Sequence, residues 1–228
     1  MFYPCQDGLL IFSGKDCLKF LNSVSTNLVE EKSLPLSTSL CNSKGKLINH
    51  LTIFKIGELY PAICHMGNPS GVIEYLLPKK LTQEVEVRDV SGINTLNYNF
   101  TENVAHGVEK NGNSTVVRIK KNLSIWITPN SEDIDIIYAT DEEWIDWRIH
   151  NFYPIYPNEL SEKYTPYNCG LDEYVHTGKG CYTGQEILTR MKSRNSFGRT
   201  LKIVDNDKLG TENPTSKGSI ASLVISKS

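Results

Sequence analysis

The chain has 228 residues, 39% hydrophobic and 22% charged, so it is long enough to bury the core of one or two globular domains. This composition excludes a disordered chain, and the formal net charge of -2 lacks the basic excess of a general nucleic-acid-binding protein. Residues 1–12 have no secretory pattern, and no apolar run approaches the length of a membrane span. We therefore expect a cytoplasmic protein that binds neither membranes nor, directly, nucleic acid.

The first half of the chain alternates between strand and helix patterns. Asp7–Phe12 predicts a strand, and Lys15–Leu28 predicts a helix because its apolar residues recur close to helical spacing. A turn-rich segment, Cys41–Lys46, precedes a strand pattern over Leu47–Ile56. Two further elements, a short helix and a half-buried strand, are expected at Val72–Leu77 and Val85–Val90.

The second half contains more strand patterns. Thr115–Ile119 and Leu123–Thr128 are separated by Lys121–Asn122, which predicts a hairpin turn. Thr140 and Glu143 form a capping box, which predicts a helix to about residue 149. The remaining predictions are a strand at Ile134–Tyr138, an irregular proline-rich connection over Asn151–Asp172, and strands at Arg199–Val204 and Ser219–Ser226. Helices and strands mix without a regular βαβ rhythm, which favours the α+β class.

Six cysteines are spread along the chain without any C-x-x-C pair. Their spacing is unlike that of a zinc site or a ferredoxin-type cluster site, so we expect no bound metal. In a chain of this length without a secretory pattern, reduced thiols are favoured over disulfides. Most of these cysteines are therefore expected to be small buried hydrophobic residues.

The segment that begins at Lys179 carries the strongest signal for chemistry. Thr183 and Glu186 form a second capping box, which predicts a helix from Thr183 to about residue 193. Cys181 lies two residues before that expected cap, and Lys179 is close by in sequence. A helix N-terminus and a cation both favour the thiolate, so Cys181 is a candidate reactive or ligating thiol. The alternative is a structural cysteine in a tight turn.

The residues from Lys179 to Glu186, KGCYTGQE, resemble without a mismatch the K-G-C-Y-x-G-Q-E motif of the YgfZ family. Arg190 matches the arginine that commonly follows this motif. The other matching segments are Gly14-Lys-Asp16, Phe20-Leu21, Thr26-Asn27, Lys44-Gly45-Lys46 and Arg148-Ile149 with Pro154. The resemblance covers most of the chain up to about residue 200.

This resemblance implies a fold, because YgfZ proteins are similar to the T-protein of the glycine cleavage system. It implies an α+β folate-binding domain over residues 1–198, including a ferredoxin-like middle portion. The C-terminal β-barrel of the family is expected to be shortened here to a β segment at 199–228, because the tail after Cys181 is short.

The resemblance also implies a function, that of a folate-binding accessory factor in the assembly or repair of 4Fe–4S proteins. The implied cofactor is tetrahydrofolate, and the implied partners are iron–sulfur client or assembly proteins. Effects on tRNA thiolation would be indirect, through an iron–sulfur enzyme. Whether the chain turns over a substrate stays open.

The family motif assigns Cys181 as the functional thiol, with Lys179 beside it. Lysines of the turn can meet the glutamate tail of folate, and Tyr182 can offer an aromatic surface. The alternatives without a ligand are that the turn lysines are solvated charges and that Tyr182 packs in the core. The residues expected to line the tetrahydrofolate site are Asn27, Lys44, Lys46, Arg148, Tyr182, Gln185, Glu186 and Arg190.

Several positions depart from the aminomethyltransferase pattern. Asn49 and His50 stand where those enzymes carry an acidic pair, and His150 replaces a further acid. Phe152 replaces the glycine that follows. Without these carboxylates conventional aminomethyl transfer is not expected. The alternatives are a folate-dependent aminomethyltransferase or demethylase, a thiol-based enzyme without folate, and an interaction protein that keeps only the fold.

Overall fold

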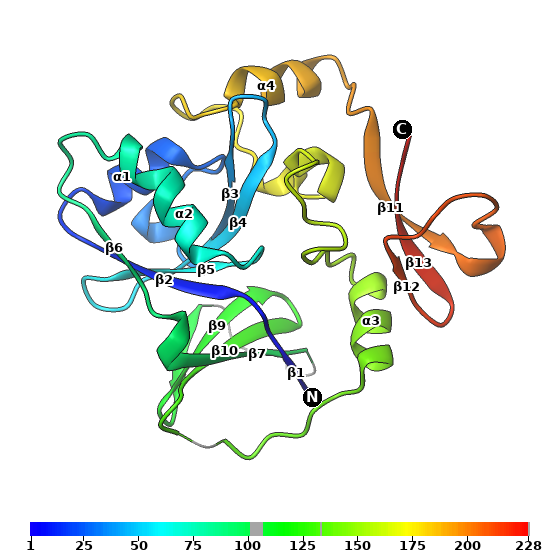
Figure 1. Ribbon diagram of the computed structural model, residues 1–228, viewed down its shortest axis with the longest axis horizontal. Helices are drawn as coiled ribbons and strands as arrows, with labels where there is room; N and C mark the ends of the chain where they lie inside the picture. The colour runs from blue at the N-terminus through cyan, green and yellow to red at the C-terminus, as the bar shows by residue number, and fades with distance from the viewer. Residues whose placement is uncertain (101–106, 133, 228) are drawn as a thin grey trace.

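The computed structural model describes residues 1–100, 107–132 and 134–227. In these residues, two five-stranded sheets and one three-stranded sheet form the framework, and short helices lie around them (Figure 1). All paired strands within the three sheets are antiparallel. Intermixed helices and antiparallel sheets are the α+β class that the sequence predicts.

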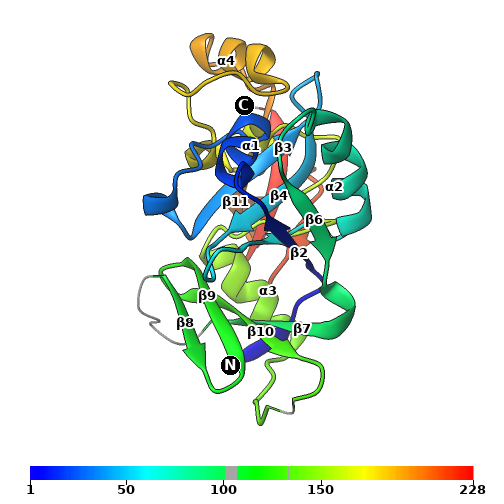
Figure 2. The ribbon, with the colours of Figure 1, turned by 90° about the vertical axis from the view of Figure 1, so that its left-hand side faces the viewer.

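The first sheet has the order β3-β4-β5-β2-β6. Its strands are β2 (Gly8–Ser13), β3 (Leu36–Cys41), β4 (Leu47–Ile53), β5 (Tyr60–Cys64) and β6 (Glu86–Asp89). Helices α1 (Cys17–Val24) and α2 (Pro69–Leu76) pack against this sheet (Figure 2). Phe20 of α1 and Val72 of α2 join Leu10 and Leu51 of the sheet in one buried core. Each buried side chain of this size contributes ~1.5–3 kcal/mol of transfer free energy.

The second sheet has the order β1-β7-β10-β9-β8. Its strands are β1 (Phe2–Pro4), β7 (Asn94–Asn99), β8 (Val108–Asn111), β9 (Ser114–Lys120) and β10 (Leu123–Pro129). Leu9 and Ile63 of the first sheet share a core with Tyr98 and Ile125 of the second. Trp144 of α3 (Asp141–His150) completes that core. The first sheet is therefore covered on both faces, by helices and by the second sheet.

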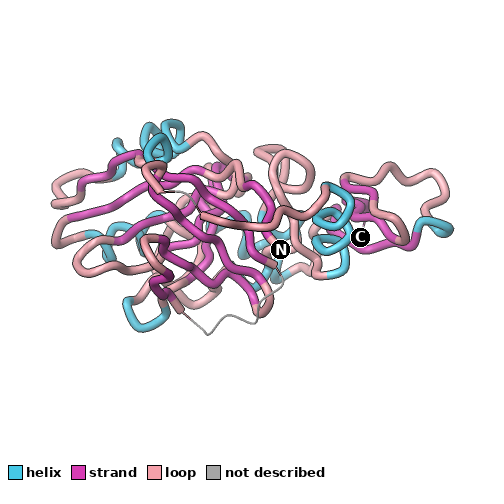
Figure 3. Tube along the Cα trace, turned by 90° about the horizontal axis from the view of Figure 1, so that it is seen from below, coloured by secondary structure: helices cyan, strands magenta, loops and turns pink. Residues whose placement is uncertain are grey.

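Three C-terminal strands form an open sheet of order β11-β13-β12, so the expected barrel portion does not close among the described residues. They are β11 (Arg199–Asp205), β12 (Ser216–Lys217) and β13 (Ala221–Lys227). This sheet lies at one end of the molecule (Figure 3), where Leu223 packs against Ile149 of α3. The division of the chain at residue 198 stays a prediction.

Local signals predicted several elements and missed others. The hairpin turn at Lys121–Asn122 is confirmed, and so is the capping box, in which Glu143 N donates to Thr140 Oγ1 over 3.2 Å. The strand expected at Ile134–Tyr138 is wrong, because only an isolated bridge from Tyr138 to Phe2 forms there. The sequence analysis did not predict β1, β3, β5, β7, β8 or β12. The short 3-10 helices are Glu31–Ser33, Leu77–Lys79, Ser91–Ile93, Pro166–Cys169, Asp172–Tyr174 and Asn206–Lys208.

A buried ion pair joins α3 to the C-terminal sheet. Arg148 Nη1 donates to Glu159 Oε2 over 3.1 Å, and the two side chains are 1% and 0% exposed. Arg148 Nη2 donates to Ser216 Oγ over 2.8 Å, and Ser216 in turn donates to Glu159 Oε1 over 2.7 Å. The guanidinium is thus enclosed by protein groups and serves as a connector in the fold.

Replacing Arg148 by methionine tests this connection. We expect Arg148→Met to lower the free energy of unfolding by about 3–5 kcal/mol, because Glu159 keeps a buried charge without its partner. Urea denaturation measures the loss. Arg190→Met, which removes one side of an exposed ion pair with Glu186, is the control and should cost no more than ~0.5 kcal/mol. Equal losses in the two variants would contradict the structural role of Arg148.

Candidate functional site

The Lys179 side chain attaches the 179–186 segment to the end of α1. Its ammonium group donates to the backbone carbonyl oxygens of Asn22, Ser25 and Asn27, over 2.7 Å for the last two. Burial lowers the pKa of Lys179 to about 8, so the charged form still predominates at neutral pH. A single cation therefore satisfies carbonyl groups that the helix end leaves without intrahelical partners.

The 179–186 segment also packs against the turn between β3 and β4. Gly184 has a φ of 87°, and a Cβ atom there would lie 2.5 Å from the backbone oxygen of Asn42. The Cα atom of Gly45 would lie 3.0 Å from the same Cβ. Only glycine meets both conditions without strain. The K-G-K turn and the K-G-C segment, remote in sequence, are therefore in contact.

The thiol of Cys181 is exposed, and the five other cysteines are free and mostly buried, as expected. Helix α4 (Gln185–Ser193) follows it, and its N-cap is Gly184 without a side-chain cap bond. The predicted cap at Thr183 is therefore wrong, because Gly184 adopts the left-handed conformation and α4 begins after it. Cys181 lies farther from the helix start than expected.

The neighbours of Cys181 have structural contacts. Tyr182 is 8% exposed and joins a buried cluster with Cys41 and Leu188. Gln185 Nε2 donates to the backbone oxygen of Lys179 over 3.4 Å and closes the loop. Glu186 and Arg190 form an exposed ion pair along α4 at 2.8 Å. These contacts hold the loop in shape and leave the sulfur atom at the surface.

A central cavity of about 500 Å³ lies between the first sheet, the β9–β10 hairpin and α3. A small inner recess of about 20 Å³ shares four of its lining residues, so we treat the two as one cavity. This size suits a small-molecule ligand. The residues that the two parts share are Ser37, Ile119, Lys120 and Tyr174.

The chemistry of this cavity is cationic and aromatic. Arg118, Lys120 and Lys121 line its outer part together with the carboxylate of Glu173. Burial lowers the pKa of Lys120, and the Glu173 carboxylate opposes that shift. The aromatic side chains in the walls are those of Trp147, Tyr153 and Tyr174. Such a cavity fits a flat ring that carries a negatively charged tail.

Two histidines form the inner end of the cavity. The His50 and His65 rings lie 5.5 Å apart, and Tyr174 lies 5.1 Å from His50. His50 exchanges a hydrogen bond with Ser39 Oγ over 3.0 Å. Burial is the main cause that holds the pKa of His50 well below its usual value, with smaller contributions from His65 and Lys120. His50 is therefore a neutral ring in the cavity wall.

Of the ten site residues that the sequence analysis names, all of which the structure describes, none lines this cavity. Asn27 Nδ2 donates to the Ser37 backbone oxygen, and Arg148 is held in the fold as described above. Lys44 is exposed at the turn. Lys46 lines a separate groove of about 750 Å³ together with Lys163, Arg199 and Lys227.

The sequence analysis missed Ser37, His65, Lys120 and Tyr174 as cavity residues. His50 was singled out because of its register with the acidic pair of aminomethyltransferases, and the structure does place it in the cavity wall. The others come from strands β3 and β9, from the turn that follows β5 and from the 3-10 helix at Asp172–Tyr174, and no local pattern marks them. Their proximity depends on tertiary packing.

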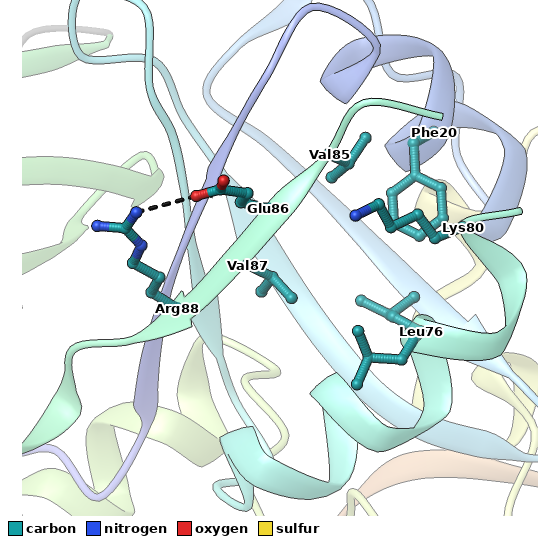
Figure 4. Close-up of a pocket in the computed structure, with 8 residues that line it drawn as sticks. Phe20, Leu76, Lys80, Val85, Glu86, Val87 and Arg88 are labelled. Atoms are coloured by element: carbon teal, nitrogen blue, oxygen red, sulfur yellow. Dashed lines mark hydrogen bonds and ion pairs between the residues drawn. The ribbon is translucent and has the colours of Figure 1, made fainter. Parts of the chain in front are cut away.

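A second cavity of about 320 Å³ lies between α2 and β6 (Figure 4). Val85 and Val87 face Leu76 and Lys80 across it, and Glu86 and Arg88, which also line it, form an ion pair with one another. None of the ten predicted site residues lines it. Its lining is mainly apolar, and it offers few polar groups to orient a ligand.

Comparisons with known proteins define the class. The fold matches the glycine cleavage system aminomethyltransferase T from Bartonella henselae with a TM-score of 0.74, at 12% identity, over 99% of this chain and 78% of that one. The described structure therefore has the glycine cleavage T-protein fold. No helix among the described residues is long and apolar enough to cross a membrane. No family profile matches the chain.

Sequence relatives refine this class. The chain is 24% identical over 222 residues to the tRNA-modifying protein YgfZ of Serratia proteamaculans, covering 85% of this chain and 67% of that protein. It is also 24% identical to an aminomethyltransferase of Caldanaerobacter subterraneus, over 94% of this chain and 67% of that protein. The chain thus spans about two thirds of the length of these relatives. In sequence the chain is thus similar to YgfZ and to aminomethyltransferases, and in fold it is similar to an aminomethyltransferase T.

Replacing Lys179 tests how the Cys181 loop is held. We expect Lys179→Met to lower the free energy of unfolding by about 2 kcal/mol, because partly buried carbonyl groups lose a charged donor. The variant should also show faster alkylation of Cys181 than wild type. Lys44→Met, at an exposed lysine, is the matched control and should change stability by less than ~0.5 kcal/mol. A Lys179→Met protein with wild-type stability and alkylation rate would contradict the anchoring role.

The buried neutral ring of His50 makes the free energy of unfolding depend on pH. Its pKa is lowered in the folded chain, so below pH 6.5 the unfolded chain binds a proton that the folded chain resists. Stability is therefore lost as the pH falls. Between pH 6.5 and 5.5, wild type should lose up to ~1.4 kcal/mol more than His50→Gln. Urea denaturation at both pH values measures the difference, and equal losses would contradict it.

Proposed function

We propose that the protein is a folate-binding accessory factor for the assembly or repair of 4Fe–4S proteins. Tetrahydrofolate occupies the central cavity, and Cys181 acts as the functional thiol. The observation that supports this most strongly is the cavity of about 500 Å³, with aromatic walls and a cationic outer part, inside a T-protein fold. The relative named as an aminomethyltransferase and the YgfZ relative also support a folate ligand.

The cavity residues fit tetrahydrofolate in a defined way. Tyr174 and Trp147 offer ring surfaces, and the buried polar groups of Ser37 and His50 suit the polar edge of a pterin. Lys120 and Lys121 suit the carboxylates of the glutamate tail. Bound tetrahydrofolate supplies one-carbon chemistry, and the chain's own groups bind it, orient it and exclude water. This assignment replaces Lys44 and Lys46 as the residues proposed to meet the tail.

The exposed thiol supports a role toward a macromolecular partner. Cys181 lies in a loop fastened by Lys179 and closed by Gln185, and it does not line the central cavity. A thiol held at the surface is reachable by another protein, whereas a ligand within the cavity is separated from it. Folate binding and thiol chemistry are therefore separable functions in this proposal, which also fits an iron–sulfur client or assembly protein as partner.

Aminomethyl transfer is the second candidate, favoured by the names of the relatives and of the matched structure. Against it stands the composition of the cavity, in which Glu173 is the one lining carboxylate among the described residues and His50 occupies an expected acidic position. Incubation with an aminomethyl or N-methyl donor and tetrahydrofolate distinguishes the two. Sustained one-carbon transfer would favour the enzyme.

Tetrahydrofolate titration monitored by tryptophan fluorescence tests the proposal, because Trp147 lines the cavity. We expect quenching in wild type and an affinity about tenfold weaker in Lys120→Met, which loses a charge-assisted contact. Lys46→Met is the matched control, since this lysine lies in the separate groove. Its affinity should stay within about twofold of wild type.

Cys181→Ala separates the two functions. We expect it to bind tetrahydrofolate like wild type and to fail in restoring 4Fe–4S enzyme activity to cells that lack the protein. Full restoration by Cys181→Ala would exclude the thiol role. Absence of tetrahydrofolate binding in wild type would exclude the folate role and favour a thiol-based protein without folate.

A further inference from the structure

A continuous line of buried hydrogen bonds connects the central cavity to a carboxylate behind it. Ser37 Oγ lies 2.9 Å from Thr52 Oγ1, which lies 2.8 Å from His65 Nε2. His65 Nδ1 lies 2.7 Å from Asp7 Oδ2. Thr52 is 1% exposed and His65 is 5% exposed, so the line is shielded from bulk water. Ser37, at its outer end, lines both parts of the cavity, and Thr52 lines the outer part and His65 the inner recess.

The carboxylate fixes the direction of every hydrogen bond in this line. Asp7 accepts a bond at Oδ2 from Tyr98 Oη as well, over 2.9 Å, so it acts as an ionised acceptor. A neutral His65 ring must then carry its proton on Nδ1, which leaves Nε2 as an acceptor. The Thr52 hydroxyl donates to Nε2 and accepts from Ser37. The remaining lone pairs of Ser37 Oγ are left as acceptors toward the cavity.

We propose that Asp7 and His65 form the acid–base centre of the central cavity and exchange a proton with a bound ligand through the Thr52 and Ser37 hydroxyl groups. The ligand group that faces Ser37 is an N–H donor. The inference rests on the proposed function only in taking tetrahydrofolate as the ligand. None of these four residues is among those that the sequence analysis predicts to line the tetrahydrofolate site.

The proton transfer balances without any further reactant. A proton leaves the ligand N–H group for Ser37 Oγ while the Ser37 proton passes to Thr52 Oγ1. The Thr52 proton passes to His65 Nε2 and produces an imidazolium ion beside the Asp7 carboxylate. The ligand thereby loses one proton and the imidazole gains one. The reverse sequence returns the proton, and no electrons are transferred.

Protonation of His65 reverses the donor and acceptor roles in every hydrogen bond between His65 and Ser37. Nε2–H then donates to Thr52, Thr52 donates to Ser37, and Ser37 presents a donor to the cavity. A ligand N–H group would meet a second donor there, so its binding weakens at low pH. The titratable and charged groups around Asp7 and His65, from all the elements packed there, are Cys5, His50, Cys64, Asp89, Tyr98, Lys120, Tyr153, Glu173 and Tyr174.

Nuclear magnetic resonance of protein with ¹⁵N-labelled histidine tests the centre without any ligand. The His65→Gln spectrum identifies the His65 signals among those of the five histidines. We expect neutral His65 to carry its proton on Nδ1, because the Asp7 carboxylate accepts a hydrogen bond from that nitrogen. Protonation of neutral His65 on Nε2 would overturn the proposal.

Calorimetric titration with tetrahydrofolate at pH 7.5 and pH 5.5 tests the exchange with ligand. In wild type we expect binding about tenfold weaker at pH 5.5, because one donor–acceptor contact becomes a donor–donor contact. Thr52→Val keeps the side-chain shape and breaks the line, so its affinity should change by less than about twofold between the two pH values. Ser37→Ala interrupts the same line of hydrogen bonds at a second position, and its affinity should likewise change by less than about twofold between the two pH values.

Ser39→Ala is the matched control, since it removes the hydroxyl that bonds to His50 and leaves the line to His65 intact. It should keep the wild-type pH dependence. Loss of this dependence in Ser39→Ala, with retention in Thr52→Val and Ser37→Ala, would overturn the proposal in favour of His50. If wild type binds no tetrahydrofolate, the proposed function fails, and the ligand-free resonance experiment still decides the state of Asp7 and His65.

Discussion

The short segment at the end of α1, Ser25–Asn27, is the point on which both halves of the candidate site depend. Its carbonyl groups receive the Lys179 ammonium, which fixes the loop of the exposed thiol. The Thr26 hydroxyl donates to the backbone oxygen of Tyr174 over 2.8 Å and accepts from Ser39 N over 3.0 Å, which fixes the cavity wall. A change at this segment is therefore transmitted to thiol and cavity together.

This arrangement gives a physical meaning to motifs that are remote in sequence. The T-N pair and the K-G-C segment meet because the cation of one satisfies the carbonyl groups of the other. The K-G-K turn meets the same segment at Gly184, where a side chain would collide with Asn42. Matching residues can therefore serve the scaffold: Lys179, Asn27 and Gly184 shape the site without facing a ligand in the cavity.

The sequence could predict what local rules determine. The capping box at Thr140, the hairpin turn at Lys121–Asn122 and the α+β class follow from side-chain and backbone chemistry over a few residues. Gly184, and not Thr183, is the N-cap of α4. A glycine adopts positive φ without strain, and it can therefore take the N-cap position in place of a residue with a capping hydroxyl group. The cavity could not be predicted, since Ser37, His65 and Lys120 come together only when strands from two sheets pack.

The separation of thiol and cavity also constrains the chemistry that the chain can perform. A ligand in the cavity meets hydroxyl groups, imidazoles and cations, which move or hold protons and orient anions. The exposed sulfur of Cys181 meets whatever docks on the loop. Ser25–Asn27 contacts both regions, and Leu160 and Leu171 of the cavity wall share a buried core with Tyr182, the neighbour of Cys181. Coupling between ligand and thiol therefore requires movement of the Ser25–Asn27 backbone or of this shared core, and rigidity of both would leave the two sites independent.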